Sequence, residues 1–217
     1  MNSVMNFIDQ VMELFAKYGD RVYLGEAVTQ REHALQAATL AEKRNGSASQ
    51  IAAALLHDIG HIINVSESDA AESIYADNAD DLHEEIGFRW LSAYFSPKVS
   101  DLVRLHVPAK RYLCAVEEDY IKLLSKTSVR SLHDQGGSMT SSEVKMFESE
   151  PYATDAVAVR RWDDGAKVPN METPDLTHFR TYLDTAFNNS ALDTSPLAKA
   201  FLTFAFSSLV IPDDIGP

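Results

Sequence analysis

The sequence predicts an all-α protein that folds as a single domain, and three observations support this prediction. Apolar residues recur every three or four positions along almost the whole chain, which is the spacing of one helix face. No apolar–polar alternation of useful length predicts a β-strand. Residues typical of helix ends separate the apolar segments. With 217 residues, 45% of them hydrophobic, the chain can bury a core without a disulfide or structural metal.

The N-terminal elements carry clear boundary signals. Apolar residues in the range 4–15 have helical spacing and predict a first helix, which a glycine-containing loop at residues 20–28 follows. Thr29 and Glu32 have the spacing of a capping box, so the second helix is expected to begin there. It is expected to end at about Arg44, before an Asn-Gly pair typical of a left-handed helix terminus.

The rest of the chain continues the helical pattern. Residues 51–63 are apolar on nearly every side and predict one buried helix, which Ser47 or Ser49 is expected to open. Residues 64–81 are polar and acidic and are expected to form a long loop. A later helix is expected to be interrupted at Pro108. The later helices are expected at 82–94, from Pro97 onward, at 120–132, after a Ser141 or Ser142 cap, at 153–162, from about 175, and from Pro196.

Charge and cysteine content restrict the class of partner. The chain has 19 basic and 32 acidic residues, a net charge of −13, which disfavours binding to nucleic acid or to an anionic membrane. The single cysteine, Cys114, excludes an intramolecular disulfide and a cysteine zinc site. We see no signal peptide and no apolar run long enough for a bilayer, so we expect a cytoplasmic protein with a small-molecule partner. The oligomeric state stays open.

Histidine and aspartate residues form a pattern typical of metal ligands. His57 and Asp58 are adjacent in an apolar segment, and His61 follows one turn later on the side of His57. Burying an imidazole and a carboxylate together is costly without a partner, and an iron, manganese or zinc ion suits both groups. Three other expected helices each carry a histidine beside apolar residues: His33, His83 and His106. A lone buried histidine is usually structural, but helical bundles build metal sites from such a set.

This pattern resembles the HD-domain superfamily, which is named for its metal-binding His-Asp pair. The resemblance implies one HD domain over residues 1–217, with a helical core at about 20–185 and a helical C-terminal extension at about 190–211. The ligands that it implies are His33, His57, Asp58 and Asp163 for a first metal ion, and Asp58, His83 and His106 for a second.

Within the superfamily, the chain resembles the mixed-valent di-iron oxygenases that act on 1-hydroxyphosphonates, such as 2-amino-1-hydroxyethylphosphonate dioxygenase. Ordinary phosphohydrolases of the superfamily lack two signatures found here, Tyr-x-Gly-Glu at residues 23–26 and His-Val-x-Ala-Lys-Arg-Tyr at residues 106–112. The other matching segments are 57–61, 83–87, 125–128, 135–139 and 160–163. The resemblance implies two iron ions in a mixed-valent Fe(II)/Fe(III) state.

The same resemblance implies residue roles. Tyr23 would ligate one iron in the resting enzyme and leave when substrate binds, while Glu26 on the same loop would contact the substrate amine. The residues implied to line the phosphonate group are His61, Lys110, Ser128, Gln135 and Arg160. Tyr23, Glu26 and His61 are expected to act in catalysis. The substrates would be an organophosphonate and O2, and the products phosphate and a carboxylic acid such as glycine or glycine betaine.

Residue spacing is consistent with this site, and alternatives remain open. Lys110 lies four residues after His106 and Arg160 three before Asp163, so each cation is expected one turn from a metal ligand. The first alternative is a metal-dependent phosphohydrolase acting on a nucleotide or phosphate monoester, and the second is a ligand sensor without catalysis. The substituent beside C1, a primary amine, trimethylammonium or none, also stays open. The acidic loop at 67–85, with Tyr75, would suit a cationic end.

Overall fold

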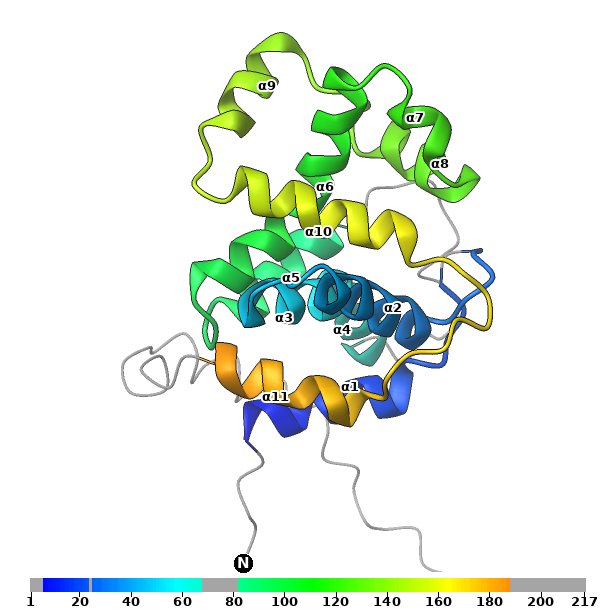
Figure 1. Cartoon of the computed structure of the whole chain (residues 1–217), viewed down its shortest axis with the longest axis vertical. Helices are drawn as coiled ribbons and strands as arrows, with labels where there is room; N and C mark the ends of the chain where they lie inside the picture. The colour runs from blue at the N-terminus through cyan, green and yellow to red at the C-terminus, as the bar shows by residue number, and fades with distance from the viewer. Residues whose placement is uncertain (1–5, 24, 68–81, 188–217) are drawn as a thin grey trace, which may run out of the picture.

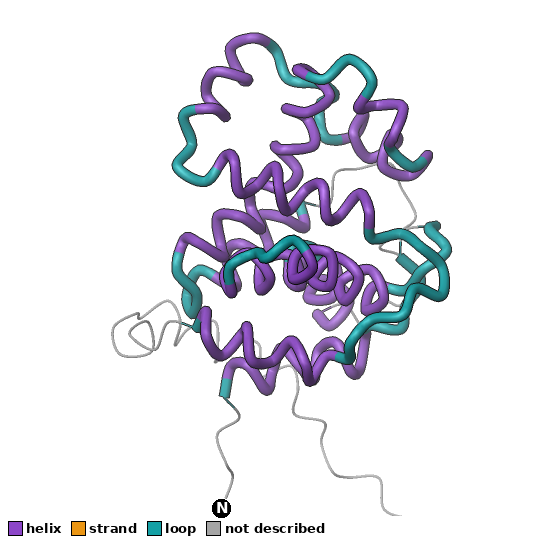
Figure 2. The backbone as a smooth tube through the Cα atoms, viewed as in Figure 1, coloured by secondary structure: helices purple, strands orange, loops and turns teal. Residues whose placement is uncertain are grey.

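A computed structural model of the chain describes residues 6–23, 25–67 and 82–187. Helices and loops, without any strand, make up this described part, which confirms the all-α prediction (Figure 2). The helices are α1 (Phe7–Tyr18), α2 (Gln30–Lys43), α3 (Ala48–Leu56), α4 (Ile59–Glu67), α5 (His83–Leu91), α6 (Pro97–Val116), α7 (Tyr120–Leu123), α8 (Lys126–Asp134), α9 (Ser141–Glu148), α10 (Ala153–Gly165) and α11 (Leu176–Ala186).

Several predicted helix boundaries are confirmed by the hydrogen bonds of their caps. The Thr29 side chain accepts from the backbone N–H of Glu32, and the Glu32 carboxylate accepts from the Thr29 N–H, which completes the capping box of α2. Asn45 is left-handed after α2, with φ of 56°. Ser47 caps α3 in the same reciprocal way with Gln50. Each cap satisfies backbone donors that a helix terminus leaves unpaired.

The single helix predicted over residues 51–63 is wrong. Helix α3 ends at Leu56, and α4 begins at Ile59 and continues to Glu67, into the predicted loop. Adjacent side chains on an unbroken helix diverge by about 100°. A turn at His57 and Asp58 instead lets both side chains face the same interior, so the break serves the His-Asp pair.

Three other expectations need correction. Pro108 does not interrupt its helix, because α6 runs through it from Pro97 to Val116. The buried face of α6 packs on α3, α5 and α10, and this packing offsets the loss of about 3 kcal/mol that an internal proline causes. The helix predicted at 120–132 is two helices, because Ser125 caps α8. Thr140, rather than Ser141 or Ser142, caps α9.

The helices are arranged around a core that α6 and α10 cross (Figure 1). Helices α5, α3 and α10 pack on α6, and α10 also packs on α2. On the other side, α11 packs on α3 and α1, and α1 packs on α4. The core is apolar and fully buried at residues such as Phe15, Leu55, Leu102 and Phe179. Helices α2, α3, α5, α6 and α10 therefore present their inner faces to one shared interior.

The start of α4 passes unusually close to the start of α5. A Cβ atom at Gly60 would lie 2.0 Å from the backbone oxygen of His83, a distance that real Cβ atoms do not reach. Only glycine fits this position, since any side chain would push the two backbones apart. Gly60 thus brings the His57-Asp58 turn next to His83.

Some expectations concern residues outside the described part of the chain. The C-terminal extension at 190–211 lies there, as does most of the acidic loop at 67–85, including Tyr75. Among the described residues, no helix has both the length and the apolar character that a membrane crossing requires.

Candidate active site

Six imidazole and carboxylate side chains from different parts of the sequence meet in the interior. Each is at most 6% exposed, although ionisable side chains are rarely buried without a partner. They extend from α2, the α3–α4 turn, α5, α6 and α10. The residues are His33, His57, Asp58, His83, His106 and Asp163, and we call them the histidine–aspartate cluster.

The first half of this cluster surrounds one point. His33 Nε2 lies 3.0 Å from His57 Nε2. Asp58 Oδ2 lies 3.5 Å from His33 Nε2 and 3.4 Å from His57 Nε2. Asp163 Oδ1 lies 3.3 Å from His33 Nε2 and 3.9 Å from His57 Nε2. Two imidazole nitrogens and two carboxylate oxygens thus converge, from the four residues that the resemblance implies for a first metal ion.

The second half uses the other oxygen of Asp58. His83 Nε2 lies 3.1 Å from His106 Nε2. Asp58 Oδ1 lies 3.3 Å from His83 Nε2 and 3.4 Å from His106 Nε2. One carboxylate therefore faces two pairs of histidines through its two oxygens, the arrangement of a carboxylate that bridges two cations.

Hydrogen bonds to backbone carbonyls fix the imidazole tautomers. A carbonyl only accepts, so the nitrogen that contacts it must carry the proton. Nδ1 of His33 donates to Ala166 O at 2.7 Å, Nδ1 of His57 to Ala54 O at 2.9 Å, and Nδ1 of His106 to Val103 O at 2.6 Å. In the neutral rings Nε2 therefore keeps its lone pair and points into the cluster.

This donor set fits metal ions. Unprotonated Nε2 atoms facing one another at 3.0 Å and 3.1 Å repel unless a cation lies between them. Among the described residues, Asp58 Oδ2 is buried without a hydrogen-bond partner, which is costly for a carboxylate and is relieved by a metal ion. Imidazole nitrogen and carboxylate oxygen together suit iron, manganese and zinc.

Burial and charge set the protonation of the cluster. Burial lowers the pKa of His33, and it lowers the pKa of His106 to about 4, so both rings are neutral near pH 7. Burial opposes ionisation of Asp58 and Asp163, but the neighbouring His57 and Arg160 hold the pKa of these carboxyls well below the usual range. Burial opposes protonation of His57, but the carboxylates of Asp58 and Asp163 outweigh it and raise the pKa of this ring. A metal ion would displace that proton, because neutral imidazoles beside ionised carboxylates are the forms that bind metal.

His61 lies beside the second half of the cluster. Its ring stacks on His83, with centroids 4.0 Å apart and an interplanar angle of 17°. Two triads of described residues have ligand atoms within 4.8 Å of one another, one of which is His33, His57 and Asp58, and the other Asp58, His61 and His83. His61 thus lies within reach of both the second cation position and a molecule bound there.

The loop with Tyr23 and Glu26 covers the first half. The Tyr23 ring stacks on His33 at a centroid distance of 4.1 Å. Burial and the carboxylates of Asp58 and Asp163 raise the pKa of the Tyr23 phenol well above its usual value. Glu26 accepts a hydrogen bond from Ser125 Oγ at 2.5 Å, so the loop is attached to the start of α8. The structure therefore brings Tyr23 to the cluster and Glu26 to Ser125 at the start of α8.

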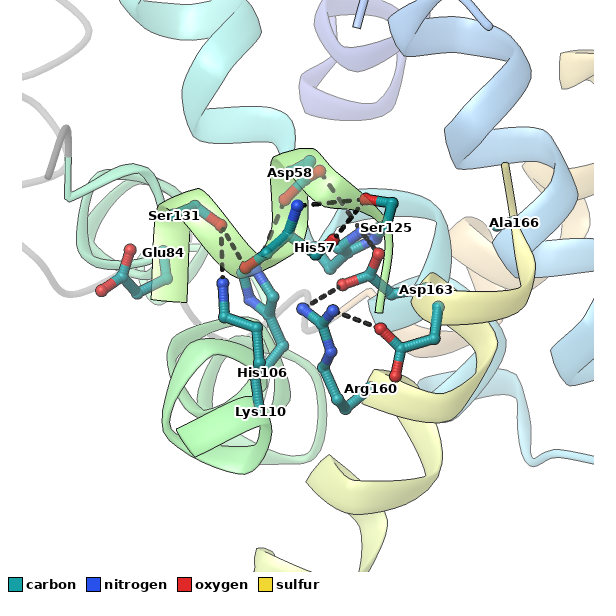
Figure 3. A network of polar contacts seen from close by, with 12 residues as sticks. His57, Asp58, Glu84, His106, Lys110, Ser125, Ser131, Arg160, Asp163 and Ala166 are labelled. Carbon is teal, nitrogen blue, oxygen red and sulfur yellow. Dashed lines mark hydrogen bonds and ion pairs between the residues drawn. The ribbon is translucent and has the colours of Figure 1, made fainter. Parts of the chain in front are cut away.

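A second polar group adjoins the cluster, with Lys110 and Arg160 at its centre (Figure 3). These side chains are only 2% and 3% exposed. Lys110 Nζ donates to Ser131 Oγ at 2.9 Å. Arg160 Nη1 pairs with Asp163 Oδ2 at 2.6 Å, which connects this group to the cluster. We define the cationic pocket as Lys110, Ser128, Ser131, Arg160 and Lys167.

Arg160 is oriented by two residues that sequence reasoning missed. Its Nε donates to the Tyr120 hydroxyl at 3.1 Å, and its Nη2 pairs with Asp164. The Tyr120 hydroxyl donates to Asp164 Oδ2 at 2.5 Å, which closes a triangle around the guanidinium. Helical spacing could have indicated Asp164, which follows Arg160 by four residues. It could not have indicated Tyr120, which is 40 residues away.

Lys167 and Ser131 were also missed, and Ser125 entered only as the first residue of the matching segment 125–128. Helical spacing could have indicated Lys167, which follows Asp163 by four residues, whereas no sequence pattern distinguishes Ser125 or Ser131. Of the expected pocket residues, Gln135 is the least connected. It follows α8, and its buried Oε1 has no hydrogen-bond partner among the described residues. Ser128 is buried and lies 3.1 Å from Ser125 by its hydroxyl.

Comparison with known proteins adds to this geometry. Residues 31–150 match the family model of the HD domain. The chain is 44% identical over 183 residues to hydroxymethylphosphonate dioxygenase of Gimesia maris, an alignment that spans 84% of this chain and 89% of that protein.

Two further similarities extend over most of the chain. It is 43% identical over 174 residues to 1-hydroxy-2-(trimethylamino)ethyl phosphonate dioxygenase (glycine-betaine-forming) of Leisingera caerulea, covering 80% of this chain and 87% of that protein. It is also 30% identical over 195 residues to an uncharacterised protein of Acanthamoeba polyphaga mimivirus, covering 87% of each.

Proposed function

Because the chain belongs to the HD-domain family, and within it to the family of phosphonate dioxygenases, we propose that it cleaves the carbon–phosphorus bond of a small 1-hydroxyphosphonate. The reaction consumes one O2, breaks the C–P and C1–H bonds, adds one oxygen atom to carbon and one to phosphorus, and leaves the C1 hydrogen as a proton of the acid products. The products are a carboxylic acid and phosphate. Both atoms of O2 enter the products, so no further reductant is needed.

The observation that carries this proposal is the position of Asp58. Its two carboxylate oxygens each lie between a pair of histidines, at 3.3–3.5 Å from their Nε2 atoms. A site for two neighbouring metal ions that share one carboxylate follows from this. The six cluster residues would hold two iron ions in a mixed-valent state, which would supply the redox chemistry that C–P cleavage requires. Water alone cannot perform this cleavage, because carbon is a poor leaving group.

The cationic pocket supports the phosphonate assignment. A phosphonate is a small dianion and needs several fixed donors, and charge-assisted hydrogen bonds are the strong ones. Lys110 and Arg160 supply two buried positive charges, and the Ser128 hydroxyl beside them supplies a polar hydrogen atom. The Ser131 hydroxyl accepts from Lys110 and donates to Ser128 O, so it orients the lysine. These residues bind the anionic end and direct C1 toward the cluster, while Tyr23 and Glu26 close the site from the loop.

The substrates of the two named relatives differ in the substituent on C1. One acts on hydroxymethylphosphonate and the other on the trimethylamino compound, and the chain is 44% and 43% identical to them. Overall identity therefore favours neither. We include both substrates in the proposal, together with 2-amino-1-hydroxyethylphosphonate, because the Glu26 carboxylate, which Ser125 attaches to the start of α8, would suit a cationic end group.

The test measures phosphate release from these three compounds, in air and without oxygen. We expect release only in air, with one O2 consumed per phosphate, from at least one compound. The Asp58→Asn variant serves as the inactive control. Equal release in an anaerobic vial would reject the oxygenase and support the phosphohydrolase, for which p-nitrophenyl phosphate is the comparison substrate. Low-temperature EPR of the iron-loaded protein tests for the mixed-valent pair.

The role of Tyr23 has its own spectroscopic test. A tyrosinate bound to ferric iron gives a visible charge-transfer band, which Tyr23→Phe should abolish. Tyr120→Phe is a matched control, since Tyr120 is also buried but contacts Arg160 and Asp164 instead of the cluster. A band that survives Tyr23→Phe would remove the ligand role of this residue.

A further inference from the structure

Lys167 enters the cationic pocket from the loop that follows α10. Its side chain is only 11% exposed, although lysine ammonium groups normally remain in water. Nζ lies 3.0 Å from Asp163 Oδ1 and 3.3 Å from Ser128 Oγ. The ammonium group therefore lies between a member of the histidine–aspartate cluster and a residue of the expected phosphonate site.

Two of the three ammonium hydrogens have partners in these contacts. An ammonium group has three donors and no acceptor, so one donor has no partner in the described part of the chain and can bind a further oxygen. Ser128 Oγ in turn lies 3.1 Å from Ser125 Oγ, and Ser125 donates to Glu26. Lys167 is thus the inner end of a row of polar groups that runs to the Glu26 loop.

The charge of the pocket calls for an anion. Lys110, Arg160 and Lys167 bring three positive charges together, and the carboxylates beside them are Asp163 and Asp164. Asp163 Oδ1 also faces His33 and His57, so its negative charge interacts with the cluster as well as with the cations of the pocket. Burial is the largest cause that lowers the pKa of Lys110 to about 8, and repulsion from Arg160 and Lys167 lowers it further. Buried like charges are stabilised by a dianion between them.

We propose that Lys167 is a third cationic ligand of the substrate phosphonate, binding one of its oxygens next to Ser128. This inference rests on the proposed function for the identity of the anion. The bound oxygen takes the free ammonium donor, and the pair with Asp163 orients the side chain. The pocket then presents three cations from α6, α10 and the loop after α10 to one small dianion.

The test uses methylphosphonate and inorganic phosphate, which lack the 1-hydroxyl group and do not react. Their affinities are measured by calorimetry on the iron-loaded protein, in wild type, Lys167→Met and Lys167→Arg. A buried charge-assisted hydrogen bond predicts an affinity loss of about 10- to 100-fold in Lys167→Met. Lys167→Arg keeps the charge and should recover most of the affinity. Iron content should stay at the wild-type level in both.

A matched control removes the same charge outside the pocket. Lys126 is on α8, close in sequence to Ser128, but is exposed, so Lys126→Met should leave both affinities unchanged. If Lys167→Met loses iron while the iron-loaded fraction binds methylphosphonate normally, Lys167 only positions Asp163 and the proposal is wrong. If wild type cleaves no hydroxyphosphonate yet Lys167→Met weakens methylphosphonate binding, the proposed function fails and the anion site stands.

Discussion

The histidine–aspartate cluster and the cationic pocket are neighbours that are held in place in different ways. In the cluster, His57 and His106 donate to carbonyls three residues earlier on their own helices, those of Ala54 and Val103. In the pocket, Lys110 is held by Ser131, 21 residues away, and Arg160 by Tyr120, 40 residues away. The orientations of these two rings are thus set locally, although His33 donates to Ala166 O, 133 residues away. Pocket geometry depends throughout on how α6, α7, α8 and α10 pack together.

The two regions meet at Asp163. One of its oxygens faces the histidines, and the other pairs with Arg160. Lys167 contacts the same carboxylate from the pocket side. A change that damages the cluster should therefore remove metal and activity together, whereas a change confined to the pocket should weaken anion binding and leave metal bound.

The largest effect is expected from Asp58→Ala, because Asp58 is shared by both halves of the cluster. Losing it should remove both metal ions and lower kcat/KM more than about a thousandfold, since metal-derived stabilisation amounts to several kcal/mol. Metal content by mass spectrometry and phosphate release measure the two outcomes. Asp164→Asn is the matched control on the pocket side and should retain its metal. Two bound metal ions per chain in Asp58→Ala would contradict the bridging position.

The next largest effect is expected from Gly60→Ala. The new methyl group would meet the His83 backbone oxygen at 2.0 Å, so α4 and α5 must separate. Overpacking of this kind costs about 3 kcal/mol, and it should also displace His83 and lower metal content. Gly87→Ala is the control, because its nearest neighbour at 3.1 Å is the movable side chain of Val103, and it should cost about 1 kcal/mol or less. Urea unfolding measures both, and equal losses would show that backbone contact is not decisive.

The same contrast explains what sequence reasoning could predict. His33, His57, His83 and His106 were readable as candidate metal ligands because each stands beside apolar residues in an expected helix, whereas Asp163 came from the resemblance to the HD-domain superfamily. The caps of α2 and α3 were readable because both partners lie within four residues. The turn at His57 and Asp58 could not be predicted from the sequence, since local apolar character favours one continuous helix. It forms because the close approach at Gly60 joins two helices that are separate in sequence.

Only part of the cationic pocket could be predicted from the sequence, for the same reason. Lys110 and Arg160 could be placed beside His106 and Asp163 by helical spacing. Their partners Ser131 and Tyr120 are ordinary residues that become relevant only when α7 and α8 pack beside α6 and α10 (Figure 1). Pro108 shows the converse case, since tertiary packing overrides a strong local signal for a helix break.

A smaller effect is expected from Tyr120→Phe, which removes the hydroxyl that holds Arg160 and Asp164. Without it, the guanidinium loses one fixed partner, and a hydrogen bond of this kind contributes about 1 kcal/mol. We expect KM to rise by roughly five- to tenfold with kcat and iron content nearly unchanged. Tyr112→Phe is the control, because the Tyr112 hydroxyl contacts Glu148 on α9, outside the pocket. An unchanged KM in Tyr120→Phe would show that Asp164 alone orients Arg160.

The smallest effect is expected from pH, and it concerns Lys110. Burial, and then repulsion from Arg160, lowers the pKa of Lys110 to about 8. A cation whose pKa is lowered loses its charge as pH rises through that value, so affinity for the phosphonate dianion should be highest below pH 8 and fall above it. Calorimetric titration with methylphosphonate between pH 6 and 9.5 measures the inflection. Methylphosphonate ionises in the same way with the Lys110→Arg variant, but the guanidinium keeps its positive charge. This variant should therefore bind methylphosphonate as tightly above pH 8 as below it. A wild-type decline that Lys110→Arg reproduces would place the titrating group outside Lys110.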